Sequence, residues 1–234
     1  MKKHIASILF LFLLSTFQLI AQSHSVKRLG IEQGLSNNYV VSITQDKQGF
    51  LWFATEEGLN KFDGTRFTTY YKNDLTQDNQ GITGNELNRV YADTKHPIIW
   101  IATQRDGLNA YNYNEQTFTA YQHNPENPHS LITNDVTDIA PSTQHDDGLW
   151  ISTYYRGIEY LDITSGQFTH YNKSTVPSLP CDQTWTVLDG GDGNLYIGHV
   201  GSGFSIFSPK DKSVKNFRNE AGNPMSLPGN DVFC

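Results

Sequence analysis

The sequence repeats itself four times with a period of about 48 residues, and this repeat limits the folds open to the chain. Each copy begins with Asn or Asp, at Asn38, Asn85, Asn134 and Asp182, and Asn230 starts a fifth copy. A bulky aromatic residue follows in each copy, at Trp52, Trp100, Trp150 and Tyr196, and then a glycine, at Gly58, Gly107, Gly157 and Gly203. Repeats of this length are supersecondary units that cannot bury their apolar faces alone, so the sequence predicts a stack or a ring of such units.

The first copy divides into four short β-rich runs that are separated by Gly, Asp and Asn. They cover residues 40–46, 50–55, 58–63 and 66–71. Such runs, with turn residues between them, predict four antiparallel strands per repeat. The predicted fold is therefore all-β, a β-propeller of four-stranded antiparallel blades, in which the recurring aromatic rings fill the space between neighbouring blades. The blades are expected at about residues 36–71, 83–121, 133–171 and 181–217.

Residues 1–21 have the composition of a secretory signal peptide. Lys2 and Lys3 precede an apolar run from Ile5 to Ile20, and the small residue Ala21 follows that run. A signal anchor that stays in the membrane is the alternative, although spanning helices usually need about 20 apolar residues.

The rest of the chain, residues 22–234, is expected to be an incomplete propeller. Val26 and Leu29 repeat the apolar pair that closes each copy, which predicts an orphan outer strand at residues 25–30, and residues 230–234 are expected to form an orphan inner strand. A propeller closes by pairing its first strand with its last blade. Because about seven blades of this period would close, we expect the chain to hold about four of seven. A genuine four-bladed protein with ragged ends is the alternative.

Charge and cysteine content exclude some classes of function. The chain has 17 Lys and Arg against 24 Asp and Glu, a net charge of −7. Nucleic acid and anionic membrane surfaces are therefore unfavourable partners. Cys181 and Cys234 are too few to form a disulfide framework.

The first copy, GLSNNYVVSITQDKQGFLWFATEEGLNKFDGTRFTTY, resembles the two-component regulator propeller repeat. It has the GLS-N start, then D-x-x-G-x-L-W-x-x-T and G-L-N-x-F-D. The second and third copies keep most of this pattern, whereas the fourth departs from it with Tyr196 in place of Trp and with Gly198 and His199 before the loop. The resemblance covers residues 34–234.

The resemblance implies a parent protein larger than this chain. Such propellers form the periplasmic sensor half of hybrid two-component regulators, typical of Bacteroidetes. There two propellers and a β-sandwich precede a membrane helix, a histidine kinase, a receiver and a DNA-binding module. The implied role is sensing of oligosaccharides in the periplasm by a homodimer anchored in the inner membrane, and the implied partners are the remaining blades and the second propeller. None of the later modules is expected within these residues.

A slot of variable sequence follows the second strand of each blade and indicates a recognition surface. Its contents are Glu56-Glu57, then Gln104-Arg105-Asp106, then Tyr154-Tyr155-Arg156, and then His199 to Ser202. Variable loops on a repeated frame suit binding, although loops also vary for lack of constraint. Aromatic rings and arginines suit sugars, including acidic ones. The predicted ligand-binding residues are Arg105, Tyr154, Tyr155, Arg156 and His199.

No catalytic, metal-binding or cofactor motif is expected in the sequence. It contains no G-x-S-x-G, no H-E-x-x-H and no C-x-x-C, and its histidines share no repeat position. The favoured function is a non-catalytic sensor. The alternative is a secreted propeller enzyme, a lyase or a glycan-cleaving enzyme, for which only Glu56, Asp106 and His199 occupy candidate slots. A scaffold without a ligand is a third possibility.

Overall fold

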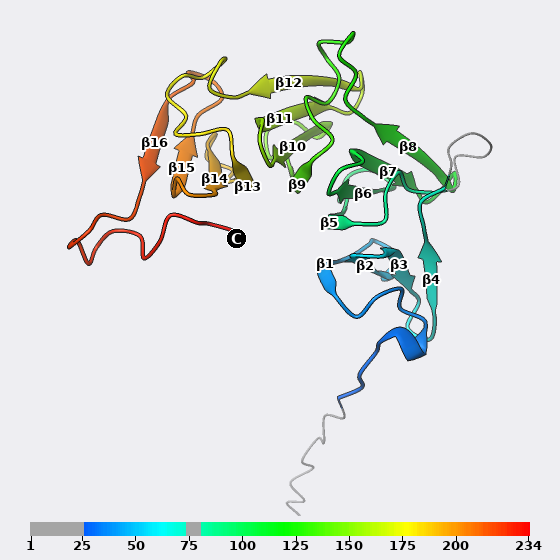
Figure 1. Ribbon diagram of the computed structural model, residues 1–234. Helices are drawn as coiled ribbons and strands as arrows, with labels where there is room; N and C mark the ends of the chain where they lie inside the picture. Colours follow the sequence, from blue (N-terminus) through cyan, green and yellow to red (C-terminus); the bar gives the residue numbers. More distant parts are fainter. Residues whose placement is uncertain (1–25, 74–80) are drawn as a thin grey trace, which may run out of the picture.

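The computed structural model describes residues 26–73 and 81–234 and shows four antiparallel four-stranded sheets arranged in an arc (Figure 1). Blade 1 contains β1 (Val40–Gln45), β2 (Leu51–Thr55), β3 (Gly58–Phe62) and β4 (Phe67–Tyr70). Blade 2 contains β5 (Leu87–Ala92), β6 (Ile98–Thr103), β7 (Leu108–Asn112) and β8 (Thr117–Tyr121). Blade 3 contains β9 (Val136–Pro141), β10 (Gly148–Thr153), β11 (Gly157–Asp162) and β12 (Gln167–Tyr171). Blade 4 contains β13 (Thr184–Asp189), β14 (Leu195–His199), β15 (Phe204–Phe207) and β16 (Val214–Phe217).

Each sheet is a simple meander in which consecutive strands pair antiparallel. The first strand of each blade lies innermost, and β1, β5, β9 and β13 contact one another in succession around the arc. The predicted fold class, a propeller of four-stranded blades, is confirmed. The signal peptide predicted at residues 1–21 lies outside the described residues.

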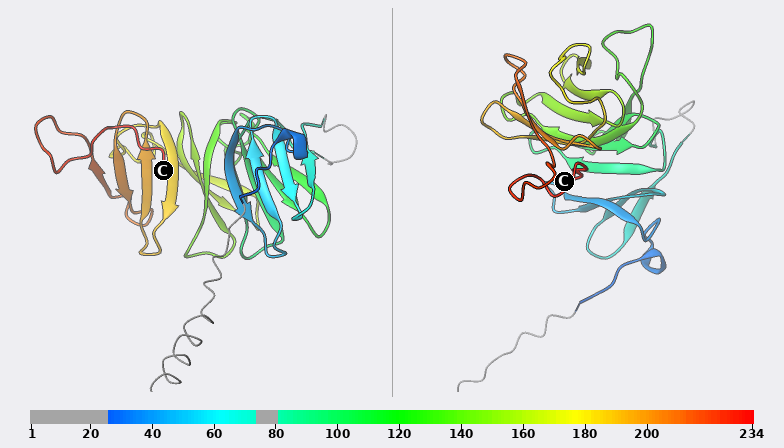
Figure 2. Two further views of the ribbon diagram at one scale, coloured as in Figure 1. Left: turned by 90° about the horizontal axis from the view of Figure 1, so that it is seen from below. Right: turned by 60° about the vertical axis from the view of Figure 1, so that its left-hand side comes forward.

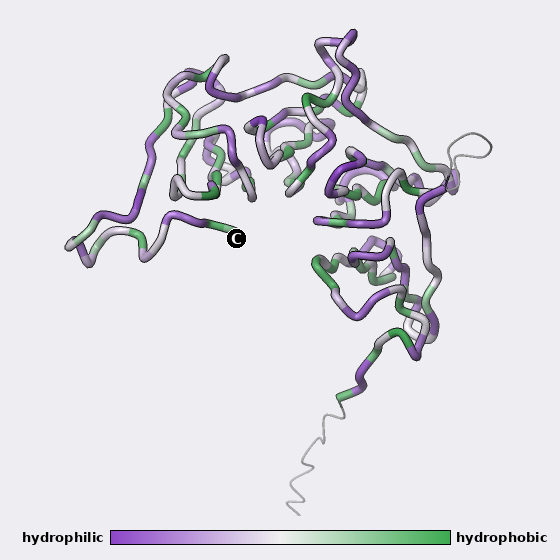
Figure 3. Tube along the Cα trace, viewed as in Figure 1, coloured by the Kyte–Doolittle hydropathy of each residue, from purple (hydrophilic) through white to green (hydrophobic). Residues whose placement is uncertain are grey.

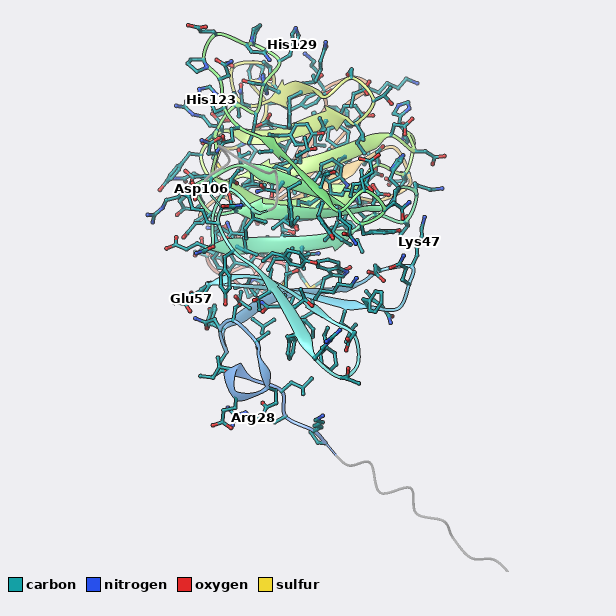
Figure 4. The ribbon with its side chains drawn as sticks, turned by 90° about the vertical axis from the view of Figure 1, so that its right-hand side faces the viewer. Arg28, Lys47, Glu57, Asp106, His123 and His129 are labelled. Atoms are coloured by element: carbon teal, nitrogen blue, oxygen red, sulfur yellow. The ribbon has the colours of Figure 1, made fainter. Side chains whose placement is uncertain are left out.

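The strands run between two opposite faces of the arc (Figure 2). One face carries the turns between the first and second strands and between the third and fourth strands. The other face carries the turns between the second and third strands and the connections from one blade to the next. Figure 4 shows Glu57, Asp106 and His123 along one edge of the molecule and Lys47 on the opposite edge. We call the face of Glu57 and Asp106 the connection face and the face of Lys47 the hairpin face.

Repeated polar residues fix the turns of the hairpin face. In blade 1 the Asp46 Oδ1 atom accepts hydrogen bonds from the backbone N–H groups of Gln48 (2.9 Å) and Phe50 (3.0 Å). Gly49 adopts a φ of 89°, which glycine tolerates without steric cost. The same Asp46 carboxylate accepts a hydrogen bond of 2.7 Å from the indole Nε1 of Trp52, so one residue holds both the turn and the core ring.

The Asn or Asp that starts each copy joins one blade to the next. Its side chain accepts a hydrogen bond from a backbone N–H just beyond the preceding outer strand, in the pairs Lys72–Asn85, His123–Asn134, Lys173–Asp182 and Asn219–Asn230. Its backbone carbonyl accepts from the repeated glycine, in the pairs Gly58–Asn85, Gly107–Asn134, Gly157–Asp182 and Gly203–Asn230. Glycine is required there because φ is positive, at 91° in Gly107, and a Cβ would collide with the carbonyl oxygen of Tyr121.

The apolar core is divided into layers between blades. Trp52 packs with Leu87, Val90 and Ile99 of blade 2, and Trp100 packs with Val136 and Leu149 of blade 3. Trp150 packs in the same way with Val187, Leu195 and Ile197 of blade 4. The prediction that recurring rings fill the space between blades is confirmed for these three. Tyr196 differs, because it is only half-buried and stacks on Phe204 of its own blade, with ring centroids 5.9 Å apart.

The two expected orphan strands stay a prediction, because neither segment has a neighbouring strand among the described residues. Residues 26–30 form no strand and lead into a short 3₁₀ helix, η1 (Ile31–Gln33), and residue 25 lies outside the described part of the chain. Residues 230–234 form no strand either, although Val232 N–H donates to the carbonyl of His199 (3.0 Å). A strand exists only where a neighbour completes its ladder of hydrogen bonds, and neither segment has one among the described residues. Asn38 nevertheless makes the contact that the other copies make at this position, because its side chain accepts a hydrogen bond from the backbone N–H of Ile31 (3.2 Å).

Hydrophobic and hydrophilic residues are interspersed along the trace rather than gathered in one stretch (Figure 3). Strand residues alternate between the two faces of a sheet, so this pattern suits sheets packed against neighbours on both sides. Within residues 26–73 and 81–234, no helix is long and apolar enough to cross a membrane.

Candidate functional site

Two arginines from neighbouring blades line one hollow on the connection face. Arg105 lies in the β6–β7 turn and Arg156 in the β10–β11 turn, and the hollow between them has a volume of about 430 Å³. His123 and the connection Ile132–Asp135 form the rest of its wall. The structure thus brings together two of the predicted residues, from slots that lie about 50 residues apart in sequence.

The guanidinium groups of these arginines are free of salt bridges to any carboxylate of the described residues. The neighbouring Asp106 instead pairs with Lys72, with 3.4 Å between Nζ and Oδ1. Two like charges facing one hollow repel each other, and the carboxylate of Asp135, which also lines the hollow, offsets only part of this excess of positive charge. An anionic group in the hollow would relieve this repulsion, and planar guanidinium groups match carboxylates, phosphates or sulfates through paired hydrogen bonds.

A row of aromatic rings lies beside the arginines. The rings of Tyr154 and Tyr155 meet edge to face with centroids 4.1 Å apart, and Tyr154 contacts Trp185 at 6.0 Å. Trp185 contacts Phe233 at 5.3 Å. The hydrogen bond to Tyr154, followed by burial, raises the pKa of Tyr155, so its phenol is neutral at physiological pH.

Trp185 and Phe233 are therefore part of this surface, and the sequence did not assign them to it. Trp185 occupies an inner strand and Phe233 lies near the end of the chain. The available signal was that Trp185 is the one tryptophan of four outside the repeated aromatic position. Rings of this size, half-exposed, bind flat apolar faces such as those of sugar rings.

The structure corrects the prediction that His199 contributes to the ligand surface. Its side chain is 0 % exposed, with Nε2 2.8 Å from Ser205 Oγ and Nδ1 3.5 Å from Cys181 Sγ. Burial lowers the pKa of His199 to about 4, so the ring is neutral and structural. The burial of His199 could have been predicted from the repeat, because His199 aligns with Thr153. The Thr153 side chain is also buried, and its hydroxyl donates a hydrogen bond to the carbonyl of Gly157.

The three residues that an enzyme would need do not converge. Glu56, Asp106 and His199 belong to blades 1, 2 and 4, Asp106 pairs with Lys72, and His199 is buried. In the described ranges 26–73 and 81–234, no group of three or more His, Cys, Asp or Glu side chains is arranged to hold a metal ion.

The fold and this surface define a class of protein, an antiparallel propeller that carries a potential ligand surface on its connection face. Residues 34–57 match the family described as two component regulator propeller. The predicted resemblance is confirmed, and residues 34–57 carry the two-component regulator propeller repeat.

Solved structures support the same placement. The extracellular domain of the hybrid two-component system BT3049 from B. thetaiotaomicron is 69% identical, with a TM-score of 0.82 over 89% of this chain and 27% of that one. The corresponding domain of BT4673 from the same organism is 23% identical, with a TM-score of 0.67 over 82% of this chain and 27% of that one, and shows the shared fold.

Part of the chain is also similar in sequence to a histidine kinase. Histidine kinase P4 from Formosa agariphila is 42% identical over 66 residues, which is 28% of this chain and 5% of that protein. The chain therefore spans about a quarter of the solved extracellular domains and a small part of the kinase.

Proposed function

We propose that this chain is part of the ligand-sensing, extracytoplasmic region of a two-component regulator, and that it detects oligosaccharides and signals to a histidine kinase elsewhere in the same protein. The observation that carries the proposal is the surface of Arg105, Arg156, Tyr154, Tyr155 and Trp185 on the connection face. The similarity of the chain to the extracellular domain of a hybrid two-component system supports the sensing role.

The ligand chemistry follows from the surface. Half-exposed rings at Tyr154, Tyr155 and Trp185 offer apolar faces on which pyranose rings stack, and their phenol and indole groups can bond hydroxyls. Arg105 and Arg156 add donors for an acidic substituent. The rings and arginines are groups that often dominate binding energy.

The assembly proposed with this function is larger than the chain. The apolar face of blade 1 exposes Val41 and Ile43, and that of blade 4 exposes Leu188. Further blades of the parent propeller would cover these faces. Within the chain, neighbouring blades cover Val90 and Ile139, which are equivalent to Ile43, and Ala140, which is equivalent to Leu188. A periplasmic location, a homodimeric parent and a second propeller belong to the same proposal.

The test is a double substitution, Tyr154→Ala with Arg156→Ala, in the full-length protein that contains this chain. We expect affinity for an oligosaccharide that binds the wild type to fall by about 2 kcal/mol or more. Thermal stability should stay within about 0.5 kcal/mol, because exposed loop residues are involved. Isothermal titration calorimetry measures the first quantity and thermal unfolding the second.

Lys47→Ala is the matched control, since Lys47 is an exposed cation on the hairpin face. It should leave the affinity unchanged. Unchanged affinity in the double variant would place the ligand elsewhere and would contradict the proposal.

A further inference from the structure

A second hollow, of about 640 Å³, opens on the hairpin face between blades 3 and 4. The β9–β10 turn and the β13–β14 turn form its two sides, and the loop after β15 closes a third. It lies on the opposite face of the arc from Arg105 and Arg156, so it is separate from the surface proposed above.

The floor of this hollow contains an unpartnered hydrogen-bond donor. Trp150 is 6% exposed, and its Nε1 is the one buried side-chain polar atom of the described residues without a hydrogen-bond partner. In blades 1 and 2 the equivalent indoles donate to Asp46 (2.7 Å) and Asp93 (3.1 Å). Blade 3 has Ser142 at that position, and its hydroxyl accepts from the backbone of Gln144 and His145 instead.

The repeat shows in which direction this donor points. The equivalent indole N–H groups point toward the end of the first strand, where the aspartate lies. In blade 3 that place belongs to Ser142, which lines the hollow together with Trp150. Leaving a buried donor unpaired is costly, so its retention favours an acceptor supplied from outside. The N–H is closed to solvent in this structure, so a ligand in the hollow has to displace neighbouring side chains to accept from it.

The remaining walls combine rings with an excess of negative charge. Tyr160 and Tyr171 pack on Trp150 with centroids 4.8 and 5.7 Å away and also line the hollow. Asp162, Asp189 and Asp192 contribute carboxylates, and Lys210 contributes one cation. Asp189 already accepts hydrogen bonds from Thr143. Carboxylates beside aromatic faces attract an ammonium group and disfavour an anion.

We propose that this hollow is a binding site for an amino sugar. The ammonium group pairs with the Asp162 carboxylate, the apolar face of the ring lies on Tyr160, and a ring hydroxyl oxygen accepts the hydrogen bond from Trp150 Nε1. A neutral sugar lacks the first interaction, and an acidic sugar is repelled by the carboxylates.

The experiment measures the affinity of the protein containing this chain for glucosamine, glucose and glucuronate by ligand-detected NMR titration. We expect glucosamine to bind about tenfold more tightly than glucose, because one charged hydrogen bond is added. Glucuronate should not bind in the double variant Tyr154→Ala with Arg156→Ala, which lacks the aromatic and arginine groups of the connection face. Trp150→Phe should weaken glucosamine binding about fivefold, because it removes the indole donor and keeps an aromatic ring.

A second variant keeps the test decisive if Trp150→Phe unfolds the protein. Asp162 is exposed, so Asp162→Asn preserves the fold and should abolish the preference for glucosamine over glucose. Asp63→Asn is the matched control, because Asp63 holds the equivalent repeat position in blade 1, and it should change neither affinity.

Three results would overturn the proposal: no binding of glucosamine to the wild type, equal binding of glucosamine and glucose, or unchanged glucosamine affinity in the folded variants. The double variant Tyr154→Ala with Arg156→Ala should bind glucosamine normally, which distinguishes this site from the connection face.

Discussion

Single buried polar residues determine whether the backbone N–H groups at the connections between blades have hydrogen-bond partners. Asn60 in β3 and Asn109 in β7 are buried, and each accepts a backbone hydrogen bond from the segment entering its blade, from Ser36 (2.9 Å) and Thr83 (3.1 Å). Blade 3 carries Glu159 there, which accepts from Ile132 N–H (3.0 Å) and contacts His170. Buried polar groups of this kind must be paired, so their position in the repeat specifies register as well as stability.

Ser142→Asp should stabilise the protein by about 1 kcal/mol, because an aspartate there would accept from the unpaired Trp150 Nε1 as Asp46 does from Trp52. Its other oxygen would take over the backbone hydrogen bonds now made by the serine. Urea unfolding measures the change. Asp46→Ser is the reverse substitution in blade 1 and should destabilise by a similar amount, whereas a loss of stability in Ser142→Asp would show that the Trp150 donor cannot reach that position.

The candidate site could be predicted from the sequence only in part. The variable slot located Arg105, Tyr154, Tyr155 and Arg156, because it follows directly from the repeat register. Trp185 and Phe233 could not be found in that way, since they join the surface through three-dimensional proximity of an inner strand and a distant segment. His199 was assigned wrongly because the slot boundary was drawn one residue early, at the last residue of β14.

The blade is the element that the sequence specified best. Four strands, their order and the three tryptophan layers all follow from alternation, turn residues and the repeat, because each blade is built from local pairings. The strands expected at residues 25–30 and 230–234 stay a prediction for the complementary reason. Their existence depends on a partner, and a sequence pattern alone cannot supply one.

Trp100→Ala should cost about 3 to 5 kcal/mol, because the ring is fully buried between blades 2 and 3 and its loss leaves a cavity. Trp185→Ala should cost much less, since that ring is only half-buried among the aromatic side chains of the connection face. Chemical unfolding of both variants compares them. Equal destabilisation by the two substitutions would mean that the apolar layers between blades do not dominate the stability of the blades.

Across the whole molecule, the blades are joined by contacts one repeat apart. Asn88 Nδ2 donates to the carbonyl of Val136 (2.8 Å), and Thr186 Oγ1 donates to Asp138 (2.6 Å). On the hairpin face His96 joins blades 2 and 3, with Nδ1 3.1 Å from Asp93 Oδ2 and Nε2 2.8 Å from Asp147 Oδ1. Among the described residues, the main contacts between strands of different blades join nearest neighbours, so the stability of the arc depends on each of these connections.

The joint at His96 should make stability depend on pH. Both ring nitrogens face carboxylate oxygens, an arrangement that favours the doubly protonated imidazolium form of the ring. Burial opposes this charge, but the hydrogen bonds to Asp93 and Asp147 outweigh burial and raise the pKa of His96. The hydrogen bond to Glu159 likewise raises the pKa of His170. A histidine whose pKa is higher in the folded state stabilises fully below its unfolded value of about 6.5, and this contribution is lost as pH rises through the folded pKa.

We therefore expect the free energy of unfolding to fall as pH rises above about 6.5 and through the raised folded-state pKa values of His96 and His170, measured by urea unfolding at constant ionic strength. The buried His199 does not contribute in this window, because its pKa is lowered to about 4 and its effect appears only in acid. His96→Gln should reduce the slope, since the remaining amide cannot be protonated, while His129→Gln, at an exposed loop position, should leave it unchanged. A wild-type stability that is flat or rises over this range, or an identical slope in His96→Gln, would show that the imidazolium bridge does not hold blades 2 and 3 together in solution.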